Sequence, residues 1–229
     1  MSKIKFSALV SGMSGKLNGS VFARNRSGAY VRNKTTPVNP QTIYQVEVRS
    51  RLATYSSKWR DLTQSQREAW NSQVSEWAKT DIFGDIVNPT GKNLFTLVNM
   101  NLENAGGTPV NVPPSKVGVE SPTAVTITAT AGTPTLSIAF GPSPVPTDLV
   151  AVVDMTAQLG AGIGYFKNRF RQIATIPTAG TTPFDALAAY TARFGALIEG
   201  KKIAVRIKFI NSVTGEVSQS LVSSVIIGA

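Results

Sequence analysis

The hydrophobic pattern of the chain changes its period near the middle. Before residue 106, apolar residues recur every three or four positions, which is typical of amphipathic helices. After residue 123, apolar and polar residues alternate, which is typical of half-buried strands. The intervening residues 106–123 contain four prolines and no period, which predicts a semi-extended linker. The chain therefore combines a helical part with an all-β part.

Residues 37–105 are predicted to form a three-helix unit. Asn39 is a suitable N-cap for a first helix that begins at Pro40. Thr63 is spaced from Gln66 as in a capping box, which predicts the start of a second helix. A third helix is expected to begin at residues 90–91 and to end at two glycines. The apolar stripe of the first helix consists of Tyr44, Val48, Leu52, Tyr55 and Trp59.

All three tryptophans lie on the first two predicted helices. One interpretation is an aromatic platform for nucleic-acid bases or a partner, and the other is the small core of the three-helix unit. The helical spacing of Trp59, Trp70 and Trp77 favours the core.

Residues 124–229 are predicted to form a β-sandwich of the fibronectin type III or immunoglobulin kind. The absence of a cysteine pair favours the fibronectin type III kind. Lys167, Arg169 and Arg171 are expected on the outer face of one strand, where cations protect an edge strand or, alternatively, bind an acidic surface or a nucleic-acid backbone. The seven candidate strands lie at 125–129, 136–140, 149–153, 166–170, 186–190, 203–209 and 221–227. The expected fold class is thus α+β and multidomain.

Residues 1–36 form a basic arm that is rich in glycine and serine. Two short strands, 21–26 and 29–34, are expected on either side of a turn at Ser27-Gly28. An isolated two-stranded hairpin is marginal in water. We therefore expect the hairpin to be completed by the protein's own helices or by a neighbouring subunit.

The positive charge of the chain is concentrated near its N-terminus. Residues 1–60 hold eleven cations and one anion, Glu47, a difference of +10, whereas the other residues hold 12 of each sign. Such asymmetry indicates a contact surface for an acidic protein or for nucleic acid, the alternative being a solvated surface that keeps the protein soluble. The residues expected to bind a partner are Lys16, Phe22, Arg24, Arg26, Tyr30, Arg32 and Lys34.

The absence of histidine and cysteine excludes most enzyme classes that a sequence reveals. Without these residues the chain cannot supply a Ser-His-Asp or Cys-His nucleophile, a thiolate or imidazole zinc site, a disulfide or the usual haem ligands. The 13 acidic residues form no recognisable acid–base motif. We expect a non-enzymatic protein without catalytic residues, metal or cofactor, and no membrane partner, since no apolar run has the length of a membrane span.

Five segments of residues 14–105 form a pattern: Ser14-Gly-Lys-Leu-Asn-Gly-Ser-Val-Phe, Gly28-Ala-Tyr-Val-Arg, Asn39-Pro-Gln-Thr, Trp59-Arg-Asp-Leu-Thr-Gln-Ser-Gln-Arg-Glu-Ala-Trp and Gly91-Lys-Asn-Leu-Phe-Thr-Leu-Val-Asn. This pattern resembles structural proteins of tailed bacteriophages. The C-terminal part is similar to the fibronectin-type modules often appended to phage virion proteins.

The resemblance implies a component of the virion, made in the host cytoplasm and placed in the head, the neck or connector, or the tail. Its partners would be capsid, portal or tail subunits and further copies of itself. Two alternatives stay open: a nucleic-acid-binding protein whose basic arm contacts DNA phosphates, and an adhesion module that uses the sandwich.

Overall fold

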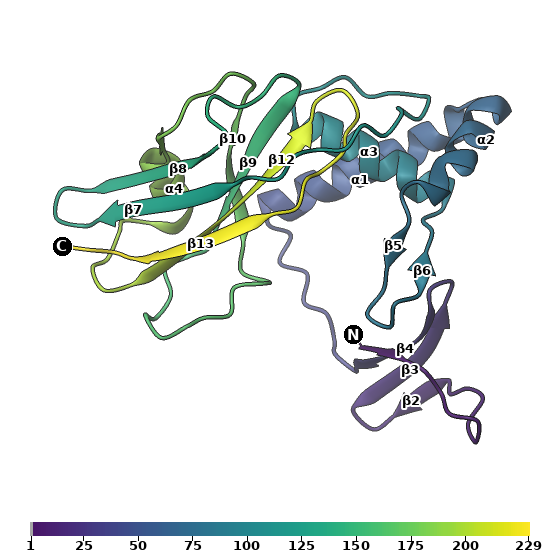
Figure 1. Ribbon diagram of the computed structural model, residues 1–229. Coiled ribbons are helices and arrows are strands. Elements are labelled where there is room, and N and C mark those ends of the chain that lie inside the picture. Colours follow the sequence, from purple (N-terminus) through teal and green to yellow (C-terminus); the bar gives the residue numbers. More distant parts are fainter. Residues whose placement is uncertain (1) are drawn as a thin grey trace.

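The computed structural model describes residues 2–229, which form three parts in sequence order (Figure 1). The first part is a four-stranded antiparallel sheet in the order β1-β4-β3-β2. The predicted hairpin is present, since residues 20–25 pair with residues 28–33. The strands are β1 (Ser2–Ile4), β2 (Gly15–Leu17), β3 (Ser20–Asn25) and β4 (Gly28–Asn33).

The expectation that helices or a neighbouring subunit would complete this hairpin is wrong. The chain's own strands do so, because β1 pairs with β4 and β2 pairs with β3. Each of these outer strands has three residues, which is too short for an alternating pattern to be recognised. We call residues 2–33 the N-terminal sheet.

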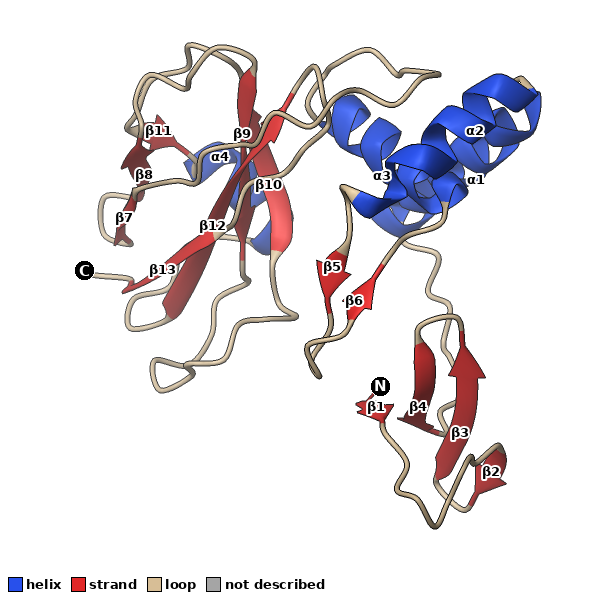
Figure 2. Cartoon of the chain, turned by 45° about the vertical axis from the view of Figure 1, so that its right-hand side comes forward, coloured by secondary structure: helices blue, strands red, loops and turns tan. Residues whose placement is uncertain are grey.

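The second part contains three helices and a small hairpin. The helices make an antiparallel arrangement, and the hairpin projects from them toward the N-terminal sheet (Figures 1 and 2). The elements are α1 (Ile43–Asp61), α2 (Gln64–Ser72), a 3-10 turn η1 (Gln73–Ser75), β5 (Lys79–Thr80), β6 (Ile86–Val87) and α3 (Gly91–Asn104).

Local signals set the start of α2 and the end of α3, as predicted. Thr63 and Gln66 form a reciprocal capping box at the start of α2. At the end of α3, Gly106 has a φ of +72°, and its N–H and that of Gly107 donate to the carbonyls of Glu103 and Leu102. This is a Schellman motif, in which glycine takes the left-handed conformation without steric cost.

The predicted start of α1 is wrong by three residues. The N-cap is Thr42, whose hydroxyl accepts a hydrogen bond from the N–H of Gln45. Gln41 has a φ of +48°, which breaks the backbone between Pro40 and the helix. The hydroxyl of Thr42 therefore begins the helix in place of Asn39.

Phe95 of α3 is the centre of the helical core. Its ring centroid lies 6.3 Å from that of Tyr55, 5.6 Å from that of Trp59 and 5.4 Å from that of Trp70. Trp77 is also buried in this cluster, so the interpretation of the tryptophans as core is confirmed. Three of the five residues of the α1 stripe do not reach the core, because Tyr44, Val48 and Leu52 are exposed.

The third part has two antiparallel sheets that pack face to face around the largest core of the chain. One sheet has the order β10-β9-β12-β13 and the other the order β11-β8-β7, and a short helix lies beside them (Figure 2). The elements are β7 (Ala124–Thr130), β8 (Thr135–Gly141), β9 (Leu149–Met155), β10 (Arg171–Ile176), β11 (Phe184–Asp185), α4 (Leu187–Phe194), β12 (Lys202–Asn211) and β13 (Leu221–Ile226).

The strand predicted at 166–170 is wrong. The N–H of Arg169 donates to the carbonyl of Phe166, which makes this segment a turn. The strand begins only at Arg171, so Lys167, Arg169 and Arg171 do not share one strand face. Phe170 is held in another way, because the guanidinium of Arg206 stacks over its ring at 4.7 Å.

The strand predicted at 186–190 is also wrong, because residues 187–190 belong to α4 and Ala186 is its N-cap. Short apolar runs do not distinguish strand from helix, and alanine and leucine are strong helix formers. Ala186 and Tyr190, four positions apart, are both fully buried in the core between the sheets. The carboxylate of Asp185 accepts a hydrogen bond from the N–H of Leu187 at the start of the helix.

The helices join the sheets at the turn between β12 and β13. The side-chain amide of Asn101 on α3 donates to the carbonyl of Gly215 at 2.9 Å. Gly215 has a φ of +68°, and a Cβ there would lie 2.7 Å from the carbonyl oxygen of Val98. Only glycine fits at this position, both for its conformation and for the close approach of α3.

The proline-rich segment 106–123 is fastened to both of its neighbours. The side chain of Asn99, fully buried on α3, exchanges hydrogen bonds with the backbone of Val110 at 2.7 and 3.1 Å. The buried carboxylate of Glu216 accepts from the N–H groups of Val117 and Gly118 at 2.9 to 3.2 Å. The segment is thus held to the helices at one end and to the sheets at the other.

The variant Phe95→Ala is expected to destabilise the helical unit by about 3–5 kcal/mol, because it removes the ring that three other aromatic rings contact. Urea unfolding followed by tryptophan fluorescence measures this loss, since all three tryptophans lie in this unit. The control Leu97→Ala, on the exposed side of the same helix, is expected to cost less than about 1 kcal/mol. Equal losses in the two variants would contradict the assignment of Phe95 as the core centre.

Candidate interaction surface

The strand register divides the predicted partner-binding residues between the two faces of the N-terminal sheet. Residues directly opposite each other in an antiparallel pair lie on the same face. Lys16 is opposite Val21, which is opposite Arg32, so both cations lie on one face with Tyr30. Phe22 and Arg24 lie on the other face.

Arg26 and Lys34 belong to neither face, because Arg26 lies in the turn between β3 and β4 and Lys34 follows the end of β4. The predicted residues therefore surround the sheet and do not form one flat patch. All five cations are exposed, whereas Phe22 and Tyr30 are half-buried.

These five cations have no carboxylate partner among residues 2–229. Residues 1–36 contain seven cations and no acidic residue, and only Lys3 and Lys5 form ion pairs. The sheet thus carries a positive charge that its own chain does not neutralise. Such a surface attracts anionic groups over a distance that the salt concentration sets.

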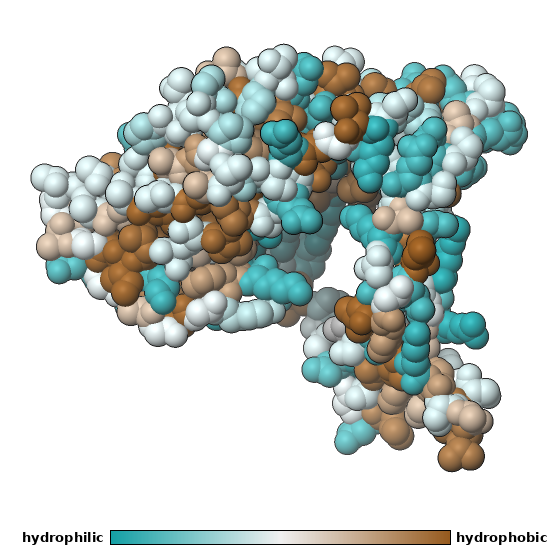
Figure 3. Space-filling view, in the orientation of Figure 1, coloured by the Kyte–Doolittle hydropathy of each residue, from teal (hydrophilic) through white to brown (hydrophobic). Residues whose placement is uncertain are grey.

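An exposed apolar loop lies beside the cations. Residues 5–14 connect β1 to β2, and within or next to this loop Leu9 is 95% exposed and Leu17 is 64% exposed. Val10 and Met13 are exposed as well. Figure 3 shows hydrophobic residues gathered at this end of the molecule. Adjacent exposed apolar residues are typical of a protein contact site.

The sequence reasoning identified the cations but missed these apolar residues. A signal was present, because Leu9, Val10 and Met13 lie in a segment of small and polar residues that has no core of its own to bury them. The candidate interaction surface consists of Leu9, Val10, Met13, Lys16, Leu17, Phe22, Arg24, Arg26, Tyr30, Arg32 and Lys34.

The N-terminal sheet is attached to the rest of the protein by a few polar contacts. Lys3 forms an ion pair with Asp81 at 2.6 Å and Lys5 forms one with Asp85 at 3.0 Å, both at the tip of the β5–β6 hairpin. The ammonium group of Lys5 also lies 5.2 Å from the ring centroid of Phe83. Otherwise the connection is the exposed segment 34–42, as Figure 1 shows.

The hydrogen bond from Lys3 lowers the pKa of Asp81 below its usual value of 3.8, and hydrogen bonds from the N–H groups of Phe83 and Asp85 act in the same direction. A carboxyl group with a lowered pKa stabilises the contact while it is ionised. The attachment is therefore favoured at neutral pH and is weakened by acid and by salt.

Comparisons with known proteins leave the surface to be interpreted from its geometry. No protein-family model matches the chain, and no curated protein matches it either. Within residues 2–229, no group of three or more histidine, cysteine, aspartate or glutamate side chains could hold a metal ion. No helix in that range is long and apolar enough to cross a membrane.

The double variant Asp81→Asn/Asp85→Asn is expected to release the N-terminal sheet from the hairpin. Because the chain has no cysteine, dyes can be attached at Ser27→Cys and Ser75→Cys, and energy transfer between them then reports the separation. We expect lower transfer in the double variant, in wild type at about 1 M salt, and in wild type as the pH falls below about 4 through the lowered pKa of Asp81.

The control for this measurement is Asp61→Asn/Glu120→Gln, which removes the same charge from two exposed residues without an ion pair among the described residues. Its energy transfer should equal that of wild type. Unchanged transfer in Asp81→Asn/Asp85→Asn would show that other contacts hold the sheet in place.

Proposed function

We propose that the chain is a non-enzymatic structural component of a tailed-bacteriophage particle that binds neighbouring subunits through its N-terminal sheet. The observation that carries the proposal is the candidate interaction surface: five unpaired cations and an exposed apolar loop on a small sheet that lies apart from both cores. The resemblance of residues 14–105 to phage structural proteins supports the same function.

The mixed chemistry of the surface favours a protein partner over DNA. A DNA backbone offers phosphates to the cations, but it gives no apolar surface to Leu9 and Leu17. An acidic protein surface with apolar residues complements both features. Capsid, portal or tail subunits of the particle, including further copies of this chain, are therefore the partners we propose, and contact with DNA phosphates is the second candidate.

We also propose that the C-terminal part is a fibronectin type III-like module. Of its seven strands, the first, second and fifth (β7, β8 and β11) share one sheet, and the other four share the second sheet. In an immunoglobulin constant module the fourth strand pairs within the sheet of the first, whereas here the fourth strand, β10, pairs with β9. This strand order supports the fibronectin type III kind, and α4 is an addition to it.

The attachment of this module to the helices bears on its orientation in the proposed particle. The helices and the sheets share the joint at Gly215 and the fastened segment 106–123. Through this joint the module would keep a defined orientation relative to the helices when the N-terminal sheet binds a neighbour. The adhesion alternative requires a binding site on the sandwich itself.

Deleting residues 1–36 is expected to abolish incorporation of the protein into particles while the two-sheet part stays folded. Incorporation is measured by quantifying the protein in purified particles, and folding by circular dichroism of the purified truncation.

The substitutions Leu9→Asp/Leu17→Asp are expected to reduce incorporation at least about tenfold, because they place carboxylates in an apolar contact.

The matched control is Tyr165→Asp/Ile198→Asp, which places carboxylates at two exposed apolar residues of the two-sheet part and should leave incorporation intact. Normal incorporation of the truncation would contradict the proposal.

The DNA candidate is tested by a separate binding measurement: if about six cations met phosphates, log K for duplex DNA would fall with log salt at a slope near −5. We expect no such salt-dependent binding.

A further inference from the structure

A groove lies between the first turns of α1 and the two-sheet part. It has a volume of about 930 Å³, and its walls come from α1, from the start of β10 and from the end of α4. A second hollow continues from it along residues 170–175, which lead into β10. The two hollows share four lining residues, Tyr44, Val48, Arg171 and Arg193. The groove thus joins elements that are far apart in the sequence.

The floor of the groove is the unpartnered half of the α1 stripe. Tyr44 and Val48 are about half exposed, although their spacing continues the buried stripe of Tyr55. Ile43 lies beside this stripe and is 84% exposed. Phe194 of α4 closes the floor on the opposite side. Exposed apolar residues at helical spacing are typical of a docking site.

Three arginines from three elements surround this floor: Arg49 of α1, Arg171 of β10 and Arg193 of α4. None of them forms an ion pair within residues 2–229. The nearest carboxylate on α1, that of Glu47, is already paired with Arg51 at 2.7 Å. The groove therefore carries positive charge around an apolar centre.

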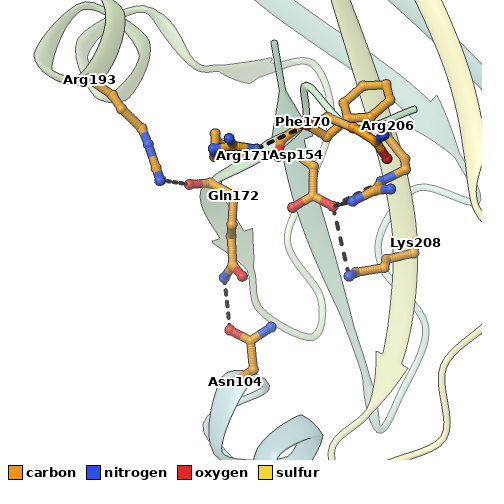
Figure 4. A network of polar contacts seen from close by, with 9 residues as sticks. Asn104, Asp154, Phe170, Arg171, Gln172, Arg193, Arg206 and Lys208 are labelled. Atoms are coloured by element: carbon orange, nitrogen blue, oxygen red, sulfur yellow. Dashed lines mark hydrogen bonds and ion pairs between the residues drawn. The ribbon is translucent and has the colours of Figure 1, made fainter. Parts of the chain in front are cut away.

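Two of these arginines are held in position by their surroundings. The guanidinium of Arg193 stacks on the ring of Tyr44, 3.9 Å from its centroid, and donates to the carbonyl of Gln172 (Figure 4). Arg171 donates to the carbonyl of Phe170 at 2.8 Å. Each keeps N–H groups that can bind a carboxylate, and prior ordering of the side chain lowers the entropy cost of binding.

Strand addition does not explain the groove, although β10 is an edge strand. The pairing of β10 with β9 is irregular between Gln172 and Ala174, and such bulges disfavour pairing at an edge. The Gln172 carbonyl is taken by Arg193, and the Gln172 side chain donates to that of Asn104 at 2.8 Å. Recognition must therefore come from side chains of the groove.

We propose that this groove binds an acidic segment of a partner protein. An apolar side chain of that segment packs against Val48 and Phe194, and flanking carboxylates accept hydrogen bonds from Arg49 and Arg171. A nucleic acid fits less well, because phosphates require a track of cations and this groove has an apolar floor between them. The inference goes beyond the proposed function, since it assigns a second binding site that does not involve the N-terminal sheet.

The test uses three fluorescein-labelled probes and the full-length protein. The first probe is the hexapeptide Asp-Glu-Leu-Phe-Glu-Asp, the second is its amide counterpart Asn-Gln-Leu-Phe-Gln-Asn, and the third is decathymidylate. Fluorescence anisotropy is expected to show binding of the acidic peptide with a Kd below about 1 mM, and at least about tenfold weaker binding of the amide peptide.

Variants then locate the binding. Arg49→Gln/Arg171→Gln is expected to lower the affinity for the acidic peptide at least about tenfold, and Val48→Ser is expected to lower it about threefold. The matched control Lys92→Gln/Lys201→Gln removes the same charge from two exposed residues outside the groove and the N-terminal sheet, and should change the affinity less than about twofold. Arg49 and Arg171 are exposed, so their replacement should leave the fold intact, which circular dichroism checks.

Four results would overturn the inference. They are no binding of the acidic peptide at about 1 mM, equal binding of the amide peptide, equal weakening by the groove variant and its control, and binding of decathymidylate alone that the groove variant abolishes. The last result would assign the groove to nucleic acid. The variants of this test lie outside the N-terminal sheet, whereas those of the incorporation test lie within it, so failure of this inference and failure of the proposed function give different results.

Discussion

The contact between α3 and the β12–β13 turn determines the arrangement of the molecule. At Gly215 the backbone of the turn approaches α3 so closely that no side chain fits, and the amide of Asn101 closes the contact with a hydrogen bond. The carboxylate of the next residue, Glu216, accepts hydrogen bonds from two backbone N–H groups of segment 106–123. Two separate cores are thus held in one orientation by a few hydrogen bonds, each of which is strengthened by burial. The arginine-lined groove follows from this orientation, because its walls come from both parts.

The N-terminal sheet is attached in a different way from the two cores. Its contacts with the rest of the chain are two ion pairs and a cation–π contact at the hairpin tip. Such contacts between partly exposed charges contribute little free energy and weaken with salt. The sheet is therefore able to adjust its position when a partner binds, while the two cores keep theirs. A small unit with unpaired cations and exposed leucines is suited to contact a neighbour. The two cores keep their own relative orientation, which the joint at Gly215 fixes.

Local signals in the sequence predicted much of the fold, and tertiary contacts explain the rest. The Thr63–Gln66 box and the glycine at 106 act within a few residues, so they were predicted correctly. The alternating pattern at 203–209 was equally reliable. The short run at 186–190 lacks such a signal, and its burial between two sheets, together with helix-forming alanines, makes it a helix. No local pattern could have shown that Arg49, Arg171 and Arg193 surround one groove, because the joint at Gly215 brings them together. The interaction surface was predicted by charge but missed in its apolar part.

The central claim is that the N-terminal sheet is the surface that contacts a neighbouring subunit. Amide hydrogen exchange, compared between the free protein and the protein within assembled particles, tests this claim most directly. We expect the exchange of residues 5–33 to slow at least about tenfold on assembly, because a partner then covers their exposed backbone groups. Strands β7, β8, β9, β12 and β13 should exchange at the same rate in both states. Unchanged exchange across residues 5–33, with new protection confined to the two-sheet part, would contradict the account.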